Sequence, residues 1–526
     1  MEVGRDNLDP STSPPPVRAA IEDPGATVEE LRAEVALLRE QNRRLEHLLR
    51  ELRRALYGRR SEKLSADERQ LAFEDLEGAV SEAEESPVPS LPSPSPKVAA
   101  KLPPPSRNLG NLPESLPRVE RVIEPDSTKC PCGCGEMVRI GEERTERLDI
   151  VPAKLRVLVT IRPKYACRVC EQGVIQAPAL AHLIEGGLPT EGTIAQVLVS
   201  KYADHCPLYR QSQIYARSGV ELHRSTLADW VGKASFHLRP VAERLAEHLK
   251  CSTKLFMDET RAPVLDPGRG RTKTGYLWAL AREDRGWSGP DPPAVVYLYA
   301  PGRGGQHAER FLRGFTGILQ VDAYAGYHRL TTRANDPLTL ALCWAHARRK
   351  LREVFDHDHS PVAAEGLRRI AEMYAIEADI RGASPEQRLA ERHARTAPLV
   401  EAFAVWLHQQ RLRVSAKSRL GQKLGYIDRH FDGLRVFLDD GRVEIDSNAV
   451  ENSIRPLALN RKNALFAGHD EGAAAWGRIA SLIETAKMNG VEPYAYLKTV
   501  LEAIAAGHPA SKIDELLPWA FTPSSH

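Results

Sequence analysis

The chain has 526 residues, of which 42% are hydrophobic and 27% are charged, a composition typical of a soluble multidomain protein and not of a fibrous one. Its net charge of +2 conceals an acidic stretch at residues 62–85, with nine acidic and two basic side chains, so the remainder is clearly basic and suits a polyanionic partner. No run approaches the ~20 apolar residues of a membrane helix, and no secretory signal is visible at the start, so we expect a cytoplasmic protein without membrane contact.

A seven-residue hydrophobic repeat occupies residues 28–60, after a polar segment (1–27) that we expect to be disordered. The core positions of the heptads hold valine, leucine and one asparagine: Val28, Leu31, Val35, Leu38, Asn42, Leu45, Leu49, Leu52 and Leu56. This pattern favours a parallel two-stranded coiled coil in which Asn42 fixes the register, and hence a homodimer or higher oligomer. A single amphipathic helix packed on its own domain is the alternative.

An acidic and then proline-rich segment, residues 61–107, separates this helix from the rest of the chain. Eight prolines lie between residues 86 and 107, among serine, lysine and alanine. Such a composition is typical of an extended, semi-rigid linker.

Five of the eight cysteines fall in a domain that we place at residues 108–180. Cys130, Cys132 and Cys134 lie in CPCGCG, and Cys167 and Cys170 form CRVC. Two such groups, bridged by a hairpin expected as two strands within 147–166, indicate a zinc ribbon, since four thiolates can close a tetrahedral shell around Zn²⁺. The spacing leaves open which two of the first three thiolates bind. Free structural cysteines are the alternative.

Residues 185–250 have a helical pattern. Gly219 predicts a tight turn between two helices, the second of which would be capped by Ser225. This is the layout of a helix-turn-helix, whose second helix, starting near Arg224 and Ser225, could enter the major groove of DNA. A structural hairpin of two helices carries the same signals.

Four strands and one helix are predicted between residues 254 and 327. KLFMDET reads as a strand ending at Asp258, followed by strands TKTGYLWALA and AVVYLYA, a helix at 307–315, and a fourth strand, GILQVDAYAGY, with Asp322 near its end. This order is ribonuclease-H-like, a fold in which the first and fourth strands are neighbours. Asp258 and Asp322 would then converge and could bridge two Mg²⁺ or Mn²⁺ ions.

A third carboxylate is expected on a later helix within DSNAVENSIRPLALNRKNALF. Asp446 or Ser447 can cap this helix, and Glu451 lies one turn before Arg455. Arg461 and Lys462 follow. An acidic metal ligand beside cations suits a site that holds a phosphate backbone against metal ions. A weak surface ion pair between Glu451 and Arg455 is the alternative.

Several long motifs together resemble the transposases of the insertion-sequence-66 family. They are MDET, VDAYAGYH, LCWAHARRKL, DSNAVENSIRPLALNRKNALFAGH and SLIETAKMNGVEPYAYL, and the upstream LYGRRSEKL and CPCGCG…KYACRVCE follow in the same order as in that family. The match extends from about residue 29 to residue 504. By motif match, the acidic triad of the family falls on Asp258, Asp322 and Glu451.

The resemblance implies a multidomain α/β protein that cleaves and transfers DNA strands with Mg²⁺. Its parts would be an N-terminal zipper, a zinc-binding domain, a ribonuclease-H-like DDE core at 251–470 with a helical insertion at about 345–440, and a small helical C-terminal domain at 471–526. The implied partners are the terminal inverted repeats of the element, target DNA and accessory proteins of the same element, met at the nucleoid.

The motif LCWAHARRKL carries a histidine and three cations whose roles differ. His346 would lie near the metal ions in one interpretation; we favour the other, a histidine bonded within the core. Arg348 and Arg349 are expected to contact phosphates of DNA.

Two rival functions are compatible with the same motifs. One is a related Mg²⁺-dependent nuclease or resolvase, which would cleave without strand transfer. The other is an inactive DNA-binding relic or regulator, against which the intact acidic triad argues.

Overall fold

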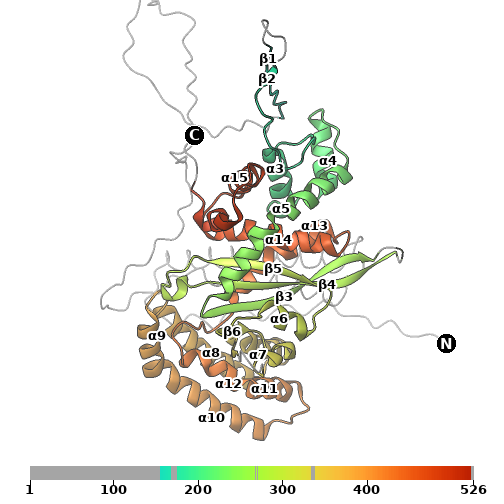
Figure 1. Cartoon of the computed structure of the whole chain (residues 1–526). Helices are drawn as coiled ribbons and strands as arrows, with labels where there is room; N and C mark the ends of the chain where they lie inside the picture. The colour runs from blue at the N-terminus through green and yellow to red at the C-terminus, as the bar shows by residue number, and fades with distance from the viewer. Residues whose placement is uncertain (1–154, 167–173, 267, 269, 333–337, 523–526) are drawn as a thin grey trace, which may run out of the picture. The chain divides into compact units, whose positions relative to one another are not determined.

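The computed structural model describes residues 155–166, 174–266, 268, 270–332 and 338–522 (Figure 1). The predicted coiled coil, the linker and the five clustered cysteines lie outside the described residues, so these predictions stay predictions. Within the described ranges, no helix combines the length and apolar character needed to cross a membrane.

A short hairpin precedes the helical part of the chain. β1 (Lys164–Ala166) pairs antiparallel with β2 (Val174–Gln176), and Tyr165 lies opposite Ile175. The predicted placement of two strands before the second cysteine pair is wrong for residues 155–163, which form no regular element. Pro163 lacks a backbone N–H and so cannot extend the ladder of β1. The strands instead lie on either side of the segment that carries Cys167 and Cys170.

Three helices follow: α3 (Glu191–Tyr202), α4 (Leu208–Arg217) and α5 (Arg224–Lys250). The predicted turn is confirmed, since Gly219 has a φ of +82°, a conformation that favours glycine. The predicted cap is wrong. His223 has an extended backbone and its ring Nδ1 accepts the N–H of Ser225, which therefore lies inside the first turn of α5.

A five-stranded sheet in the order β5-β4-β3-β6-β7 forms the centre of the fold. Its strands are β3 (Lys254–Asp266), β4 (Arg271–Arg282), β5 (Ala294–Ala300), β6 (Ile318–Val321) and β7 (Thr339–Leu342), with α6 (Gly305–Phe311) between β5 and β6. β3, β4 and β5 pair antiparallel, whereas β6 and β7 add to β3 in parallel. The prediction that the first and fourth strands are neighbours is confirmed. The prediction that β3 ends at Asp258 is wrong, because its pairing with β4 continues to Asp266.

Helix α14 (Asp470–Met488) covers the edge strand β5 (Figure 1). The Ser481 hydroxyl accepts the N–H of Tyr297 at 2.8 Å, and the Thr485 hydroxyl accepts the N–H of Val295 at 3.1 Å. These bonds satisfy backbone groups that an edge strand would otherwise leave unpaired. α14 also contacts α5, and α15 (Pro493–Ala505) contacts α3, so the C-terminal segment shares one hydrophobic core with the sheet.

The segment between β7 and residue 440 is helical and has a core of its own. Its elements are α7 (Trp344–Asp358), α8 (Pro361–Asp379), α9 (Pro385–Glu391), η3 (Arg392–Thr396), α10 (Ala397–Arg413), α11 (Arg419–Arg429), α12 (Phe431–Arg435) and η4 (Val436–Leu438). Trp344, Phe403 and Phe431 pack together at its centre. The chain then returns to the sheet through α13 (Asn448–Ala464), which packs on β3 and β4.

Candidate active site

Asp258 of β3 lies level with Asp322, which directly follows the adjacent parallel strand β6. Lys254, the first residue of β3, pairs with Ile318 of β6, and Phe256 pairs with Gln320. Continuing this register by two residues brings Asp258 opposite Asp322, which directly follows β6. Neighbouring strands are about 4.8 Å apart, so the two carboxylates share one small region of the sheet.

The electrostatics of Asp258 show that further carboxylates are close to it. Burial raises the pKa of Asp258 well above its ordinary value, and the negative charges of Glu259 and Asp322 raise it further. The charge of Glu451 acts in the same direction, whereas the Glu259 N–H, which donates to Asp258 Oδ1 at 2.7 Å, opposes the shift. Such a group of like charges is costly unless a cation or a proton neutralises it.

The face of the sheet on which Asp258 lies is the one that α13 covers. Side chains alternate along a strand, so Asp258 and Thr260 share a face. Arg461 of α13 donates to the Thr260 hydroxyl at 3.1 Å and to the Arg261 carbonyl at 2.7 Å. Glu259 points to the opposite face, where its carboxylate accepts from the Tyr327 hydroxyl at 2.6 Å and from Arg303.

Glu451 reaches the site from the first turn of α13, which is anchored to the start of α7. The Trp344 N–H donates to the Ile445 carbonyl at 3.0 Å, and the Ser447 N–H donates to Cys343 Sγ at 3.2 Å. Ser447 occupies the cap position of α13, while Asp446 accepts the N–H of Asn448 at 3.1 Å. The chain before Glu451 is therefore held at the start of α7 by one backbone hydrogen bond and one hydrogen bond to the Cys343 side chain.

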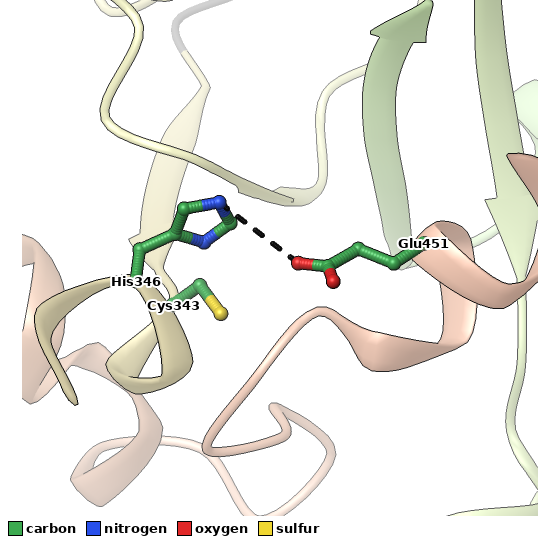
Figure 2. A group of neighbouring side chains, drawn as sticks. All are labelled: Cys343, His346 and Glu451. Atoms are coloured by element: carbon green, nitrogen blue, oxygen red, sulfur yellow. Dashed lines mark ion pairs between the residues drawn. The ribbon is translucent and has the colours of Figure 1, made fainter. Parts of the chain in front are cut away.

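Cys343, His346 and Glu451 lie together (Figure 2), and the charge of Asp322 acts on the pKa of His346. His346 Nε2 is 3.9 Å from Glu451 Oε1, and a guanidinium nitrogen of Arg349 is 3.8 Å from Glu451 Oε2. Among the described residues, the cationic groups that pair with Glu451 belong to α7.

The environment of His346 contradicts the interpretation that we favoured from the sequence. It is not bonded within the core: its buried Nδ1 has no hydrogen-bond partner among the described residues. Burial lowers the pKa of His346 below its ordinary value, while the charge of Glu451 opposes this shift. The ring lies in the first turn of α7 and faces the carboxylate of Glu451 (Figure 2).

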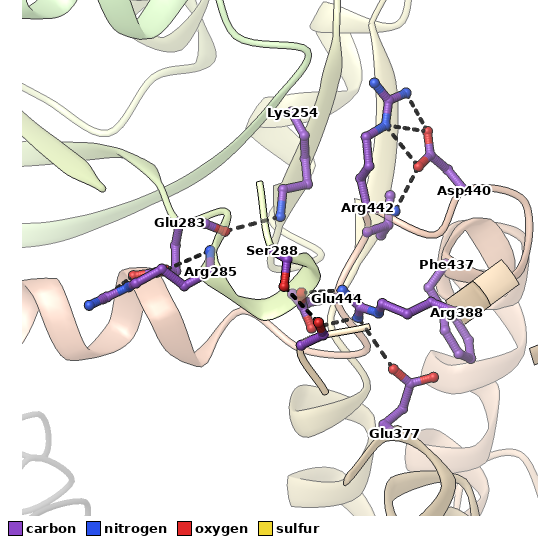
Figure 3. A network of polar contacts seen from close by, with 12 residues as sticks. Lys254, Glu283, Arg285, Ser288, Glu377, Arg388, Phe437, Asp440, Arg442 and Glu444 are labelled. Carbon is purple, nitrogen blue, oxygen red and sulfur yellow. Dashed lines mark hydrogen bonds and ion pairs between the residues drawn. The ribbon is translucent and has the colours of Figure 1, made fainter. Parts of the chain in front are cut away.

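A buried ionic network supports the segment that leads to Glu451 (Figure 3). Arg388 donates to both carboxylate oxygens of Glu444, at 2.8 and 2.9 Å. Glu377 lies 3.5 Å from Arg388 and also pairs with Arg392 at 2.7 Å. Arg392 in turn donates to the Val443 carbonyl at 2.8 Å. The helical segment therefore fixes residues 443–444 through fully buried guanidinium groups.

Of the residues that the sequence predicts to bind DNA, most lie at the surface and one lies against the sheet. Arg348, Arg455 and Lys462 are exposed, as are Arg224 and Ser225 at the start of α5. Arg461 is half-buried and bonds to β3, so the prediction that it contacts DNA is not supported: its guanidinium holds α13 on the sheet.

Two residues of the site were not identified from the sequence. Cys343 forms a C-x2-H pair with His346, a spacing that recurs among metal ligands and could have identified it. Gln320 lies on β6 and is fully buried. A buried polar residue two positions before Asp322 is a signal of a structural hydrogen bond, but its partner could not be inferred, because that partner is more than 100 residues away in the chain.

Four family descriptions match the chain in succession. "Transposase C of IS166 homeodomain" matches residues 44–121, and "zinc-finger binding domain of transposase IS66" matches residues 127–171, a range that contains all five clustered cysteines. "Transposase IS66 family" matches residues 186–475, and "IS66 C-terminal element" matches residues 481–519. The match at residues 127–171 describes a zinc-finger domain and therefore indicates that this part of the chain binds zinc.

Similar chains occur in Sinorhizobium fredii, all described as uncharacterized proteins. The protein y4qI is 42% identical over 510 residues, covering 95% of this chain and 93% of its own length. The protein y4jD is 46% identical over 419 residues, with 79% and 82% covered, and y4hP is 35% identical over 497 residues, with 91% and 89% covered.

The order of these domains and the extent of the central match define a transposase. The chain belongs to the IS66 transposase family, which confirms the resemblance seen in its motifs.

Proposed function

We propose that this chain is a DDE-type DNA transposase whose catalytic carboxylates are Asp258, Asp322 and Glu451. The observation that carries the proposal is their convergence: an aspartate of β3 level with one that directly follows the adjacent parallel strand β6, and a glutamate from α13 whose charge acts on Asp258. The reaction is the cleavage of a phosphodiester at each end of the element, followed by attack of the freed 3′-hydroxyl on target DNA. Each step forms one P–O bond and breaks another.

The strand order supports a ribonuclease-H-like core. Three antiparallel strands, a helix and a fourth strand parallel to the first occur in the chain order that this fold requires. In this core, the helical segment between β7 and α13 is an insertion, and the buried network of Arg388 and Arg392 ties it to the chain that carries Glu451.

The three carboxylates are suited to hold Mg²⁺ or Mn²⁺. These ions prefer oxygen ligands, and the buried Glu451 Oε1 has no hydrogen-bond partner among the described residues. The raised pKa of Asp258 reflects neighbouring negative charges that a divalent cation would neutralise. When bound, the ions would supply stabilisation of the charge that develops on the phosphate.

The surface cations are assigned to binding DNA. Arg348 on α7 and Arg455 and Lys462 on α13 are exposed and belong to the two helices that border the site. We assign them to the phosphate backbone, which requires charge and no sequence recognition. Arg224 and Ser225, exposed in the first turn of α5, are assigned to base contacts, as in a helix-turn-helix. The DNA would be the terminal repeats and the target.

The test is a strand-transfer assay with the full chain, DNA carrying the ends of the element, a target duplex and Mg²⁺. Asp258→Asn, Asp322→Asn and Glu451→Gln keep the side-chain volume and remove one charge each. Each change should abolish cleavage and strand transfer, yet leave the mobility shift of end DNA and the melting temperature nearly unchanged, because metal ions stabilise mainly the transition state.

Glu259→Gln is the matched control, because Glu259 neighbours Asp258 but faces Tyr327 and Arg303. Its loss of activity should be much smaller. Equal loss at Glu259 and Asp258, or full activity in any triad variant, would contradict the proposed site. Cleavage of the ends without joining to target would identify a nuclease or resolvase, and DNA binding without cleavage by the unchanged chain would identify an inactive DNA-binding protein.

A further inference from the structure

Three different ligand atoms of Cys343, His346 and Glu451 lie within 4.8 Å of one another (Figure 2). They are one sulfur, one imidazole nitrogen and one carboxylate oxygen. Mg²⁺ takes oxygen ligands, whereas thiolate and imidazole suit Zn²⁺ and similar borderline-soft cations. The composition of this cluster therefore differs from that of the carboxylate triad, with which it shares Glu451.

The sulfur of Cys343 accepts hydrogen bonds from two backbone N–H groups. It accepts the Ser447 N–H at 3.2 Å and also the backbone N–H of His346, three residues on. Burial nevertheless raises the pKa of Cys343 to about 12, and these N–H groups only partly oppose that shift, so a metal ion bound here would displace the proton of the thiol. The C-x2-H spacing at the start of α7 places both ligands on one turn, so little rearrangement is needed.

The other two ligands have unsatisfied atoms. His346 Nδ1 and Glu451 Oε1 are buried and have no hydrogen-bond partner among the described residues. A buried polar atom without a partner destabilises the protein, because it has lost its hydrogen bonds to water. A cation bound between the three side chains would satisfy such atoms, and its fourth position would remain open to water, as in zinc sites with three protein ligands.

We propose that Cys343, His346 and Glu451 form a Zn²⁺ site that is distinct from the cysteine-rich ribbon. Glu451 is shared with the carboxylate triad, so zinc bound here withdraws it from Mg²⁺. The competition between zinc and Mg²⁺ for Glu451 rests on the proposed function, whereas the binding of zinc does not. The site thus makes strand cleavage sensitive to zinc.

The test measures zinc bound to the full chain without DNA, after loading with zinc and dialysis. Cys343→Ser and His346→Gln should each bind one equivalent per chain less than the unchanged protein, whatever the ribbon retains. Cys251→Ser is the matched control, since Cys251 is exposed and follows α5; it should bind as much as the unchanged protein.

Equal zinc in the unchanged chain and in both ligand variants would overturn the proposal. His346→Gln guards against misfolding, because this side chain is partly exposed and tolerates an amide of similar length. Circular dichroism of each variant verifies the fold. A zinc deficit in Cys343→Ser alone, with normal binding in His346→Gln, would also overturn the three-ligand site.

A second arm separates this proposal from the transposase proposal. Zinc titrated into the Mg²⁺-dependent cleavage reaction should inhibit the unchanged chain, and Cys343→Ser should need at least about tenfold more zinc, the factor that loss of about 1.4 kcal/mol of binding free energy produces. If the ligand variants bind one zinc equivalent less but the unchanged chain never cleaves DNA, the zinc site is retained and the proposed transposase activity is refuted. Cleavage with equal zinc inhibition in both chains would refute the competition for Glu451.

Discussion

The side chain of Gln320 pairs with the backbone of Glu444 in both directions. Its Nε2 donates to the Glu444 carbonyl at 2.8 Å, and its Oε1 accepts the Glu444 N–H at 3.0 Å. Nε2 also donates to the Asp446 carbonyl at 2.9 Å. One buried amide thus ties the strand that precedes Asp322 to the segment that precedes Glu451. Gln320 therefore contributes, together with the contacts of this segment to α7 and to Arg388, to the relative positions of Asp322 and Glu451.

Gln320→Met should destabilise the fold and displace Glu451. Methionine has a similar volume but no hydrogen bonds, so it leaves two carbonyls and one N–H of a buried segment without partners, each costing about 1–3 kcal/mol. We expect a melting temperature lower by several degrees and weaker cleavage that higher Mg²⁺ partly restores. Gln306→Met, on the exposed side of α6, is the control. Equal melting temperatures for the two variants would show that the pairing is unimportant.

Glu444→Gln should destabilise the protein at neutral pH, and the loss should shrink in acid. Burial alone would raise the pKa of Glu444, but the bonds and charge of Arg388 outweigh it, and the pKa lies below its ordinary value. A carboxylate of lowered pKa stabilises the fold above the unfolded pKa of about 4.3, and that stability is lost as the pH falls through the folded value.

Glu377, the remaining partner of Arg388, limits how much free energy of unfolding Glu444→Gln removes. Breaking a buried pair costs about 3–5 kcal/mol, and Glu377 at 3.5 Å from Arg388 reduces this. Urea unfolding at neutral pH and below about pH 4 measures the difference. Glu401→Gln, in an exposed pair with Arg435, should change little at either pH. A loss at Glu444 that does not depend on pH would contradict the ionic role of this side chain.

Gly477→Ala should destabilise the protein although alanine favours helices by about 1 kcal/mol. Gly477 lies in α14, where an added Cβ would be 2.5 Å from the Tyr297 carbonyl oxygen of β5. The helix cannot move away without breaking the bonds of Ser481 and Thr485 to the same strand. Gly425→Ala in α11, with open space at the Cβ position, should instead raise the melting temperature. Thermal unfolding of both variants measures these changes. A higher melting temperature for Gly477→Ala would refute the close contact.

Removal of residues 1–107 should reduce the oligomeric state, because the heptads at 28–60 are expected to form the dimer. Sedimentation of the full and shortened chains measures the change. Asn42→Val should raise the thermal stability of the oligomer but allow coiled coils with different numbers of chains, since a buried asparagine fixes the register at a cost in stability. An unchanged mass after truncation would place the oligomer interface elsewhere.

The sequence by itself determined most of the local elements around the carboxylates, although not the end of the strand that carries Asp258. AVVYLYA is β5, ILQV is the strand directly before Asp322, and the helix with Glu451 lies where its motif predicts, because strand and helix patterns repeat over a few neighbouring residues. The order of these elements also sufficed to place the first strand beside the fourth.

Only the tertiary structure decided which distant groups meet. Gln320 and Glu444 are joined across 124 residues, and Glu451 lies across from Cys343 and His346 through two helices that the sequence did not pair. β3 continues past Asp258 because β4 pairs with it, not because of its own residues. Hydrogen bonds and charges of this kind act between atoms that are close in space, so no periodicity along the chain encodes them.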